Sequence, residues 1–128
     1  MTEFHATLKA IGHVENEFDE STPASRLRSS ESTLVLDPEL VLGLTGLEAG
    51  QRILVLFYFH RAEGYDLLQH PRGDADSPRR GVFALRSPRR PNPVGVTDVE
   101  LLAVDENRLR VRGLDALNGT PVLDIKPA

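Results

Sequence analysis

The residues best suited to binding a charged ligand lie in one ten-residue segment, Arg86-Ser-Pro-Arg-Arg-Pro-Asn-Pro-Val-Gly95. Each proline fixes its own φ and pushes the residue before it toward extended geometry, so the segment loses little entropy on ordering. The side chains of Arg86, Arg89, Arg90 and Asn92 are therefore held in set directions before a ligand arrives. The residues alone leave two readings open, a ligand-binding wall and a stiff connection between two strands.

Further polar groups stand beside apolar runs. His60 follows Ile53–Phe59, the most apolar run of the chain, and is either a rim residue or a group that stacks on a ligand. Asp115, Asn118 and Asp124 could cap turns, and Asp115 and Asp124 could instead accept hydrogen bonds from a hydroxyl or amino group of a ligand. The four histidines lack the spacing of metal ligands, so we expect no metal site. The sequence also has no Gly-x-Ser-x-Gly motif, so it gives little support to a hydrolytic triad.

Length and composition indicate one domain over residues 1–128. The chain has no cysteine, which excludes a disulfide framework and thiolate metal ligands. Neither a signal peptide nor a long apolar span is evident, so a soluble cytoplasmic protein without membrane contact is expected. The net charge of −4 argues against a surface that is positive throughout, yet six arginines between residues 72 and 90 allow a local basic face.

The elements that must position these groups are mostly strands. Alternating and apolar runs predict strands over 7–14, 33–36, 53–59, 81–85, 94–104, 109–114 and 121–125. Asp37 and Pro38 predict the start of one short helix, since they suit the N-cap and first helical position. Asn118-Gly119 predicts a hairpin turn, and residues 61–80 a long polar loop. The pattern predicts an all-β fold, a small barrel or sandwich with one short helix and a long loop.

Several of these runs together resemble one known family. The motifs are, in chain order, Gly81-Val-Phe-Ala84, Arg86-Ser-Pro-Arg-Arg-Pro-Asn-Pro-Val-Gly95 and Asn118-Gly-Thr-Pro-Val-Leu-Asp-Ile-Lys-Pro127. The chain is identified by them as a member of the TsaA-like, or TrmO-type, family of β-barrel S-adenosylmethionine-dependent methyltransferases. The resemblance spans nearly the whole chain.

The resemblance implies a small β-barrel that forms a homodimer, binds S-adenosylmethionine and methylates N6 of threonylcarbamoyl-adenosine next to the tRNA anticodon. It assigns no catalytic base. The implied methyl-donor contacts are Pro23, Ala24, Ser25, His60, Arg61, Arg86, Asp98, Asp115, Ala116, Leu117 and Asn118. Arg89, Arg90 and Asn92 would contact the donor, the RNA or the second subunit.

Departures from the family pattern keep other functions open. Leu85, Arg89 and Asn118 stand where the family commonly has Thr, an aromatic residue and Asp. The chain ends at Ala128, so we expect it to lack the C-terminal domain with which bacterial members engage tRNA. One alternative is therefore an S-adenosylmethionine-binding module without transferase activity, a sensor or a partner subunit. Another is an oligonucleotide-binding barrel without cofactor, which the aromatic content of 5% disfavours.

Overall fold

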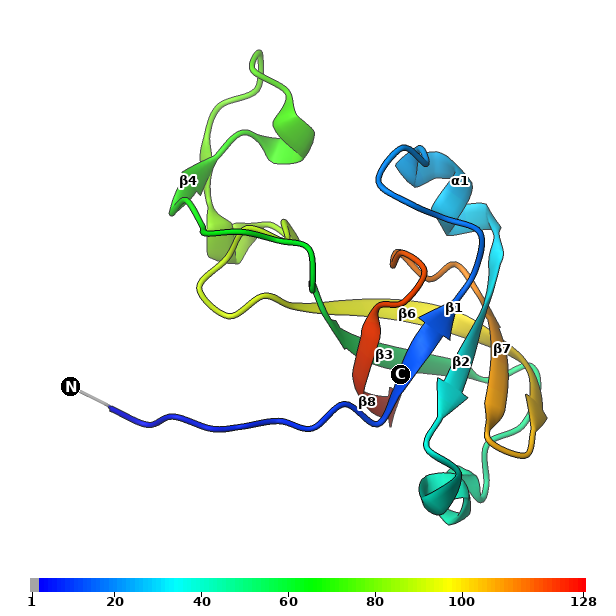
Figure 1. The fold of residues 1–128 in the computed structure, drawn as a ribbon. Coiled ribbons are helices and arrows are strands. Elements are labelled where there is room, and N and C mark those ends of the chain that lie inside the picture. Colours follow the sequence, from blue (N-terminus) through cyan, green and yellow to red (C-terminus); the bar gives the residue numbers. More distant parts are fainter. Residues whose placement is uncertain (1–2) are drawn as a thin grey trace.

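A closed barrel of six antiparallel strands forms the body of the molecule, and it confirms the expected all-β barrel (Figure 1). The structure is a computed structural model that describes residues 3–128. The strands follow one another around the barrel in the order β1–β2–β7–β6–β3–β8. Their bounds are β1 Gly12–Glu15, β2 Glu31–Leu36, β3 Arg52–Tyr58, β6 Val94–Asp105, β7 Arg108–Arg112 and β8 Pro121–Pro127.

Inward-facing side chains of every strand fill the barrel. In β3, Ile53, Val55 and Phe57 are buried, while Leu54 and Leu56 between them are half-buried on the outer face. This alternation follows because successive side chains of a strand point to opposite faces. β3 pairs with β6 on one side and β8 on the other, which confirms the central position that its apolar run predicted.

Helices are few and short. The predicted helix exists as the 3-10 helix η1 (Pro38–Leu44), and the Asp37 carboxylate accepts a hydrogen bond from the Glu39 N–H at 3.1 Å. A six-residue helix, α1 (Ala24–Ser29), was not predicted, because its N-cap is Pro23 and makes no side-chain capping bond. Within residues 3–128, no helix is long and apolar enough to cross a membrane.

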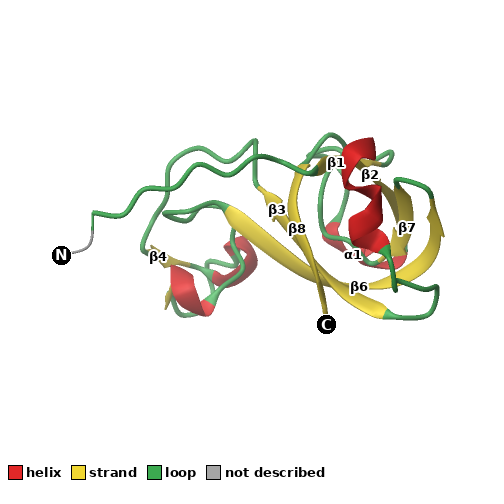
Figure 2. Cartoon of the chain, turned by 90° about the horizontal axis from the view of Figure 1, so that it is seen from below, coloured by secondary structure: helices red, strands yellow, loops and turns green. Residues whose placement is uncertain are grey.

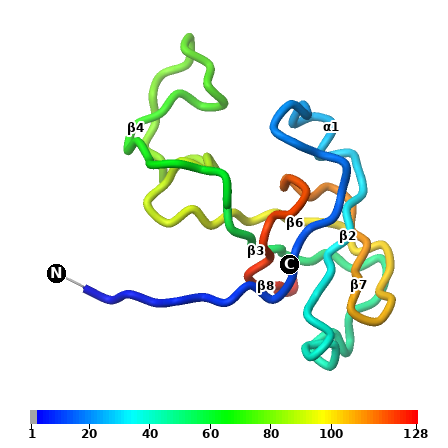
Figure 3. The backbone as a smooth tube through the Cα atoms, in the orientation of Figure 1, coloured from blue at the N-terminus to red at the C-terminus, as the bar shows by residue number. Residues whose placement is uncertain are grey.

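The first strand is shorter than the sequence suggested. Residues 7–11 were expected in a strand with 12–14, but β1 starts only at Gly12. Backbone pairing begins at Ile11, whose N–H donates to the Val122 carbonyl at 2.8 Å. Residues 3–10, called the arm below, are all exposed and extend away from the barrel (Figures 1 and 3). The alternation therefore exists without an intrachain partner.

The strand expected over residues 81–85 is also wrong. Arg80–Gly81 form the two-residue strand β5, which pairs only with β4 (Leu68–Gln69). The chain then turns through the 3-10 helix η3 (Val82–Ala84), closed by a bond from the Leu85 N–H to the Val82 carbonyl at 3.1 Å. An apolar run forms a strand only where a neighbouring strand is available to pair with it, and here the neighbour is two residues long.

Asn118-Gly119 makes a turn but not the expected hairpin. β7 pairs with β2 and β6, whereas β8 pairs with β1 and β3, so the strands on either side of this turn are not neighbours. The connection 113–120 instead crosses one end of the barrel. The true tight hairpin joins β6 to β7 at Glu106, whose φ is 54°. Its Glu-Asn sequence is a weaker hairpin signal than Asn-Gly.

The chain between β3 and β6 leaves the barrel and forms a separate projection, residues 61–92, called the lobe below (Figure 2). It holds β4, β5, η3 and a third 3-10 helix, η2 (Pro71–Gly73). Its two ends are joined at the barrel, where Tyr58 pairs with Val94 and the Phe59 N–H donates to the Pro93 carbonyl at 2.8 Å. The long loop predicted over 61–80 is part of this lobe.

Candidate functional site

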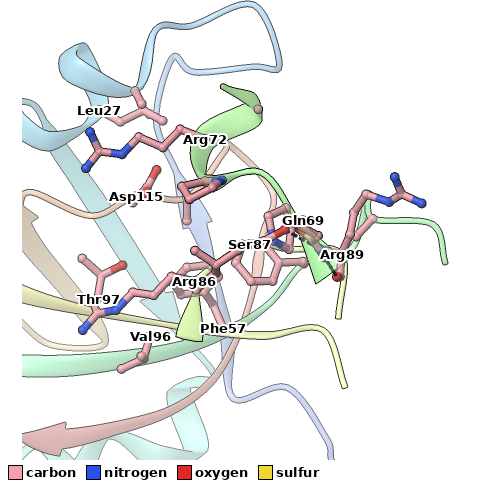
Figure 4. A pocket seen from close by; sticks show the side chains of 18 of the residues that line it. Leu27, Phe57, Gln69, Arg72, Arg86, Ser87, Arg89, Val96, Thr97 and Asp115 are labelled. Carbon is pink, nitrogen blue, oxygen red and sulfur yellow. Dashed lines mark hydrogen bonds between the residues drawn. The ribbon is translucent and has the colours of Figure 1, made fainter. Parts of the chain in front are cut away.

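A wide cleft of about 2370 Å³ separates the lobe from the barrel. Figure 4 shows side chains of both parts facing this space. The barrel contributes Phe57 and Thr97, the lobe contributes Arg86, and the opposite side is built by Leu27 of α1 and by Asp115. Small-molecule pockets commonly hold roughly 300–1,000 Å³, so this cleft has room for a nucleotide-sized ligand beside part of a larger one.

An aromatic pair lies at the root of the cleft. The rings of Phe57 and Phe59 meet edge to face, with 5.2 Å between centroids and 76° between planes. They pack on Gly95, where an added Cβ would lie 2.6 Å from the Phe57 ring and 2.8 Å from that of Phe59. Gly95 therefore allows both rings to lie against β6, which gives the cleft an apolar floor.

Two arginines of the lobe reach toward the barrel. In Figure 4 the Arg86 side chain extends toward Val96 and Thr97, and that of Arg72 extends toward Leu27 and Asp115. Neither guanidinium takes part in an ion pair or side-chain hydrogen bond within the described residues 3–128. Both are therefore free to bind a carboxylate or phosphate.

The neighbouring arginines are already engaged within the lobe. Arg90 is half-buried and donates from Nη1 to the carbonyls of Leu85 and Ser87, at 2.9 and 3.2 Å. Arg89 pairs with Asp66 at 3.0 Å. Arg90 thus fixes the shape of the proline-rich segment that carries Arg86.

The wall opposite the lobe is held by one asparagine. The Asn16 amide nitrogen donates to the Ser32 hydroxyl and to the Ala116 carbonyl, both at 3.0 Å. The Asn16 backbone N–H donates to the Asn118 side-chain oxygen, also at 3.0 Å. The segment from Asp115 to Asn118 is therefore positioned from within the barrel.

An ion pair connects that wall to the lobe. Arg61, at the start of the lobe, donates to the Glu20 carboxylate in the loop before α1. In the same loop, Asp19 accepts hydrogen bonds from the hydroxyl and N–H of Ser21, which lower the pKa of its carboxyl below the usual range. The loop before α1 is thus held by hydrogen bonds within the loop and by an ion pair to the lobe.

Charges and an apolar floor together suit a ligand with a flat ring, hydroxyl groups and a carboxylate. Phe59, packed on the buried Phe57, offers apolar surface, Asp115 offers an acceptor, and Arg72 and Arg86 offer cations. Among residues 3–128, no three His, Asp or Glu side chains gather closely enough to hold a metal ion.

Comparison with known proteins assigns the chain to a family. A sequence model of the tRNA-methyltransferase O N-terminal domain matches residues 13–128. The chain belongs to this family. It is 44% identical over 130 residues to a probable S-adenosyl-L-methionine-binding protein of Methanothermobacter thermautotrophicus, covering 99% of this chain and 93% of the relative. A protein of Archaeoglobus fulgidus named S-adenosyl-L-methionine-binding protein is 42% identical over 122 residues, and the match covers 93% of this chain and 86% of that protein.

Solved structures of TrmO have the same fold. One from Pseudomonas aeruginosa superposes with a TM-score of 0.77 at 34% identity and covers 98% of this chain. A second TrmO structure gives a TM-score of 0.78 at 35% identity. The present chain spans only 56% and 58% of those two proteins.

The cleft of this TrmO-type domain brings together most of the residues that the resemblance implied. Those that line it are Ala24, His60, Arg61, Arg86, Arg89, Asp98, Asp115, Ala116 and Leu117. Those that do not are Pro23, Ser25, Arg90, Asn92 and Asn118. Asp98 faces outward and accepts a hydrogen bond from Arg52 at 2.7 Å. Pro23 and Asn118 have structural places, as the N-cap of α1 and the partner of Asn16.

Sequence reasoning missed two residues of this TrmO-type site. Arg72 lies in the polar lobe sequence, where no pattern distinguishes it from Arg79 or Arg80, and its φ of 53° is rare for a residue with a side chain. Asn16 follows β1, and its hydrogen bonds reach residues 16 and 100 positions away. No local signal could have revealed either role.

Replacing Asn16 by alanine is expected to destabilise the domain by about 1–3 kcal/mol, because the buried Ser32 hydroxyl and the Ala116 carbonyl lose their donor. Chemical denaturation would measure the loss, and hydrogen exchange should rise over residues 115–118. The matched control is Asn92→Ala, an exposed asparagine that lines no part of the cleft. Equal stability of the two variants would contradict the role given to Asn16.

Proposed function

We propose that this protein is an S-adenosylmethionine-dependent methyltransferase that acts on an RNA base. The more specific reaction is methylation of N6 of threonylcarbamoyl-adenosine next to the anticodon of tRNA. One observation carries the proposal: the cleft of this TrmO-family chain joins unpaired arginines, an acceptor carboxylate and an aromatic floor.

The residues of the cleft fit the methyl donor part by part. Arg86 would bind its carboxylate, since a guanidinium forms two parallel hydrogen bonds to that group. Asp115 would accept hydrogen bonds from the ribose hydroxyls. His60 and Phe59 offer surfaces against which the adenine would lie, and the buried Phe57 supports the Phe59 ring. When bound, the donor supplies a methyl group made electrophilic by its sulfonium.

The chain itself then has to align the acceptor with that methyl group and keep water out. Alignment can supply a large share of catalysis when the reacting atoms are held in near-attack geometry. Arg72 and Arg86 project from the lobe while Asp115 is fixed by the barrel through the Asn16 contacts to its segment. The relative position of lobe and barrel thus determines the alignment.

The lobe also suits an RNA partner. Arg79 and Arg80 also line the cleft, and neither has an ion pair within residues 3–128. Such unpaired arginines neutralise backbone phosphates and make binding salt-dependent. We infer further that the protein acts in the cytoplasm, where tRNA lies, and that it works as a homodimer.

A second candidate function is donor binding without transfer. The names of the two relatives described above favour it, because they state binding of S-adenosylmethionine and no reaction. In that case the protein would bind both the donor and its demethylated product and modify no acceptor.

Methyl transfer separates the two functions. The purified protein is incubated with methyl-labelled S-adenosylmethionine and with tRNA that carries threonylcarbamoyl-adenosine without the added methyl group. Mass spectrometry of the digested nucleosides should then show a methyl group on that base. The same tRNA lacking the threonylcarbamoyl group is the control and should stay unlabelled. Donor binding without label in any tRNA would support the binding function and contradict the proposed reaction.

A further inference from the structure

The arm has the pattern of a strand that lacks a partner. Phe4, Ala6, Leu8 and Ala10 alternate with polar residues, so an extended backbone places them on one face. Phe4 is 81% and Leu8 67% exposed. No backbone hydrogen bond of residues 3–10 occurs within the described chain. Eight extended residues reach roughly 26 Å, far enough to cross a neighbouring molecule.

The lobe lacks a hydrophobic core of its own. Among its residues only Val82 is buried. Its large apolar side chains are mostly in solvent: Phe83 is 79%, Leu67 60%, Leu68 55% and Tyr65 53% exposed. Its sheet consists of two paired two-residue strands, so both outer edges have free backbone groups.

Within one chain, the arm does not cover the exposed apolar side chains of the lobe. Figures 1 and 2 show both projecting from the same side of the barrel, and in Figure 1 a wide separation lies between them. Every arm residue is exposed, so the arm does not pack on its own lobe. When one chain carries both surfaces of an interface, a second copy related by a two-fold axis can bind both. The arm of each chain then meets the lobe of the other, so the same contact is made twice.

The exposed apolar area favours a second copy. Aromatic side chains carry about 150–250 Å² each, so Phe4, Tyr65 and Phe83 together expose roughly 300–500 Å². With Leu8, Leu67 and Leu68 this approaches the roughly 800 Å² per partner of a stable interface. The arm itself is neutral, with one acid (Glu3) and one lysine (Lys9), so its apolar face would direct the docking.

We propose that the arm of each chain docks, apolar face inward, on the lobe of a second copy. This inference rests on the proposed homodimer and specifies how it forms. Leu67 and Leu68 also line the cleft, so the arm of one chain would border the donor site of the other. Each site would then be built by two chains.

Light scattering of arm variants tests the first half of the proposal. Phe4→Asp/Leu8→Asp should raise the dimer dissociation constant by about 100-fold or more, since two apolar anchors are lost. His5→Asp/Thr7→Asp adds the same two carboxylates on the opposite face and should stay within a few-fold of the unchanged protein. An unaltered dimer in the first variant would overturn the arm's role while the proposed homodimer stands. A monomeric unchanged protein would overturn both.

Crosslinking tests where the arm docks. Because the chain has no cysteine, a single introduced cysteine is the only thiol that can react. Chains with Leu8→Cys are mixed with differently tagged chains carrying Leu68→Cys, and a short bismaleimide is added. Leu42→Cys is the control, because Leu42 is an apolar residue on η1 that at 84% is more exposed than Leu68 at 55%, so access alone would favour position 42. Linked pairs of Leu8→Cys with Leu68→Cys should form at least tenfold faster than pairs with Leu42→Cys. Equal rates, or a preference for position 42, would overturn the lobe as the docking surface.

Discussion

Replacing Arg86 by alanine is expected to weaken S-adenosylmethionine binding by about 10- to 100-fold, because a hydrogen-bonded charge pair is worth about 1.5–3 kcal/mol. The Arg86 side chain is exposed and makes no ion pair within residues 3–128, so the fold does not depend on it. Isothermal titration calorimetry measures the affinity, and the melting temperature without ligand should stay within about 2 °C, as for most surface substitutions.

Two comparisons make this prediction specific. Arg110→Ala removes an arginine from the outer barrel, where it lies 3.7 Å from Glu31 and lines no part of the cleft, and should leave the affinity unchanged. Arg86→Lys keeps the charge but loses the planar fork, so it should recover only part of the affinity. If Arg86→Ala and Arg110→Ala bind the donor equally well, Arg86 is not a donor contact.

Gly95→Ala is expected to destabilise the domain by about 1–3 kcal/mol, which lowers the melting temperature by roughly 5–15 °C. Its Cβ would lie 2.6 Å from the Phe57 ring and 2.8 Å from the Phe59 ring, closer than atoms can approach, so both rings must move. Because these rings form the floor of the cleft, donor binding should weaken as well.

Gly81→Ala is the matched control for that substitution. An added Cβ at Gly81 meets nothing within 4 Å, so stability should change by about 0.5 kcal/mol or less. Differential scanning calorimetry of both variants gives the comparison. A melting temperature of Gly95→Ala equal to that of Gly81→Ala would show that the close packing on Gly95 does not matter.

The sequence predicted correctly the elements that depend mainly on neighbouring residues. The apolar run at Ile53–Phe59 and the Asp37-Pro38 pair gave β3 and η1, because strand alternation and helix capping depend on neighbouring residues. Similar signals failed at residues 7–11, which alternate, and at residues 81–85, which form an apolar run, because neither segment has a strand of matching length beside it. Pairing partners are a property of the whole fold, and for residues 3–10 we infer that the partner is another chain.

The candidate site shows a similar division. Arg86 could be selected from its stiff proline-rich setting, and His60 from its place after an apolar strand. Arg72 enters the cleft only because the lobe folds back toward α1, and Asn16 acts through contacts that cross the barrel. Arg90 was expected to contact the donor, the RNA or the second subunit, and the sequence did not reveal that its Nη1 also donates to the Leu85 and Ser87 carbonyls.

Thermal unfolding with and without S-adenosylmethionine tests the central claim most directly, namely that the cleft is a methyl-donor site. A ligand at about 100 times its dissociation constant adds roughly 2.7 kcal/mol of stability, which raises the melting temperature of a domain of this size by several degrees. We predict such a rise with S-adenosylmethionine and with S-adenosylhomocysteine, and none with adenine alone at the same concentration. An unchanged melting temperature with both ligands, over a wide concentration range, would contradict the claim.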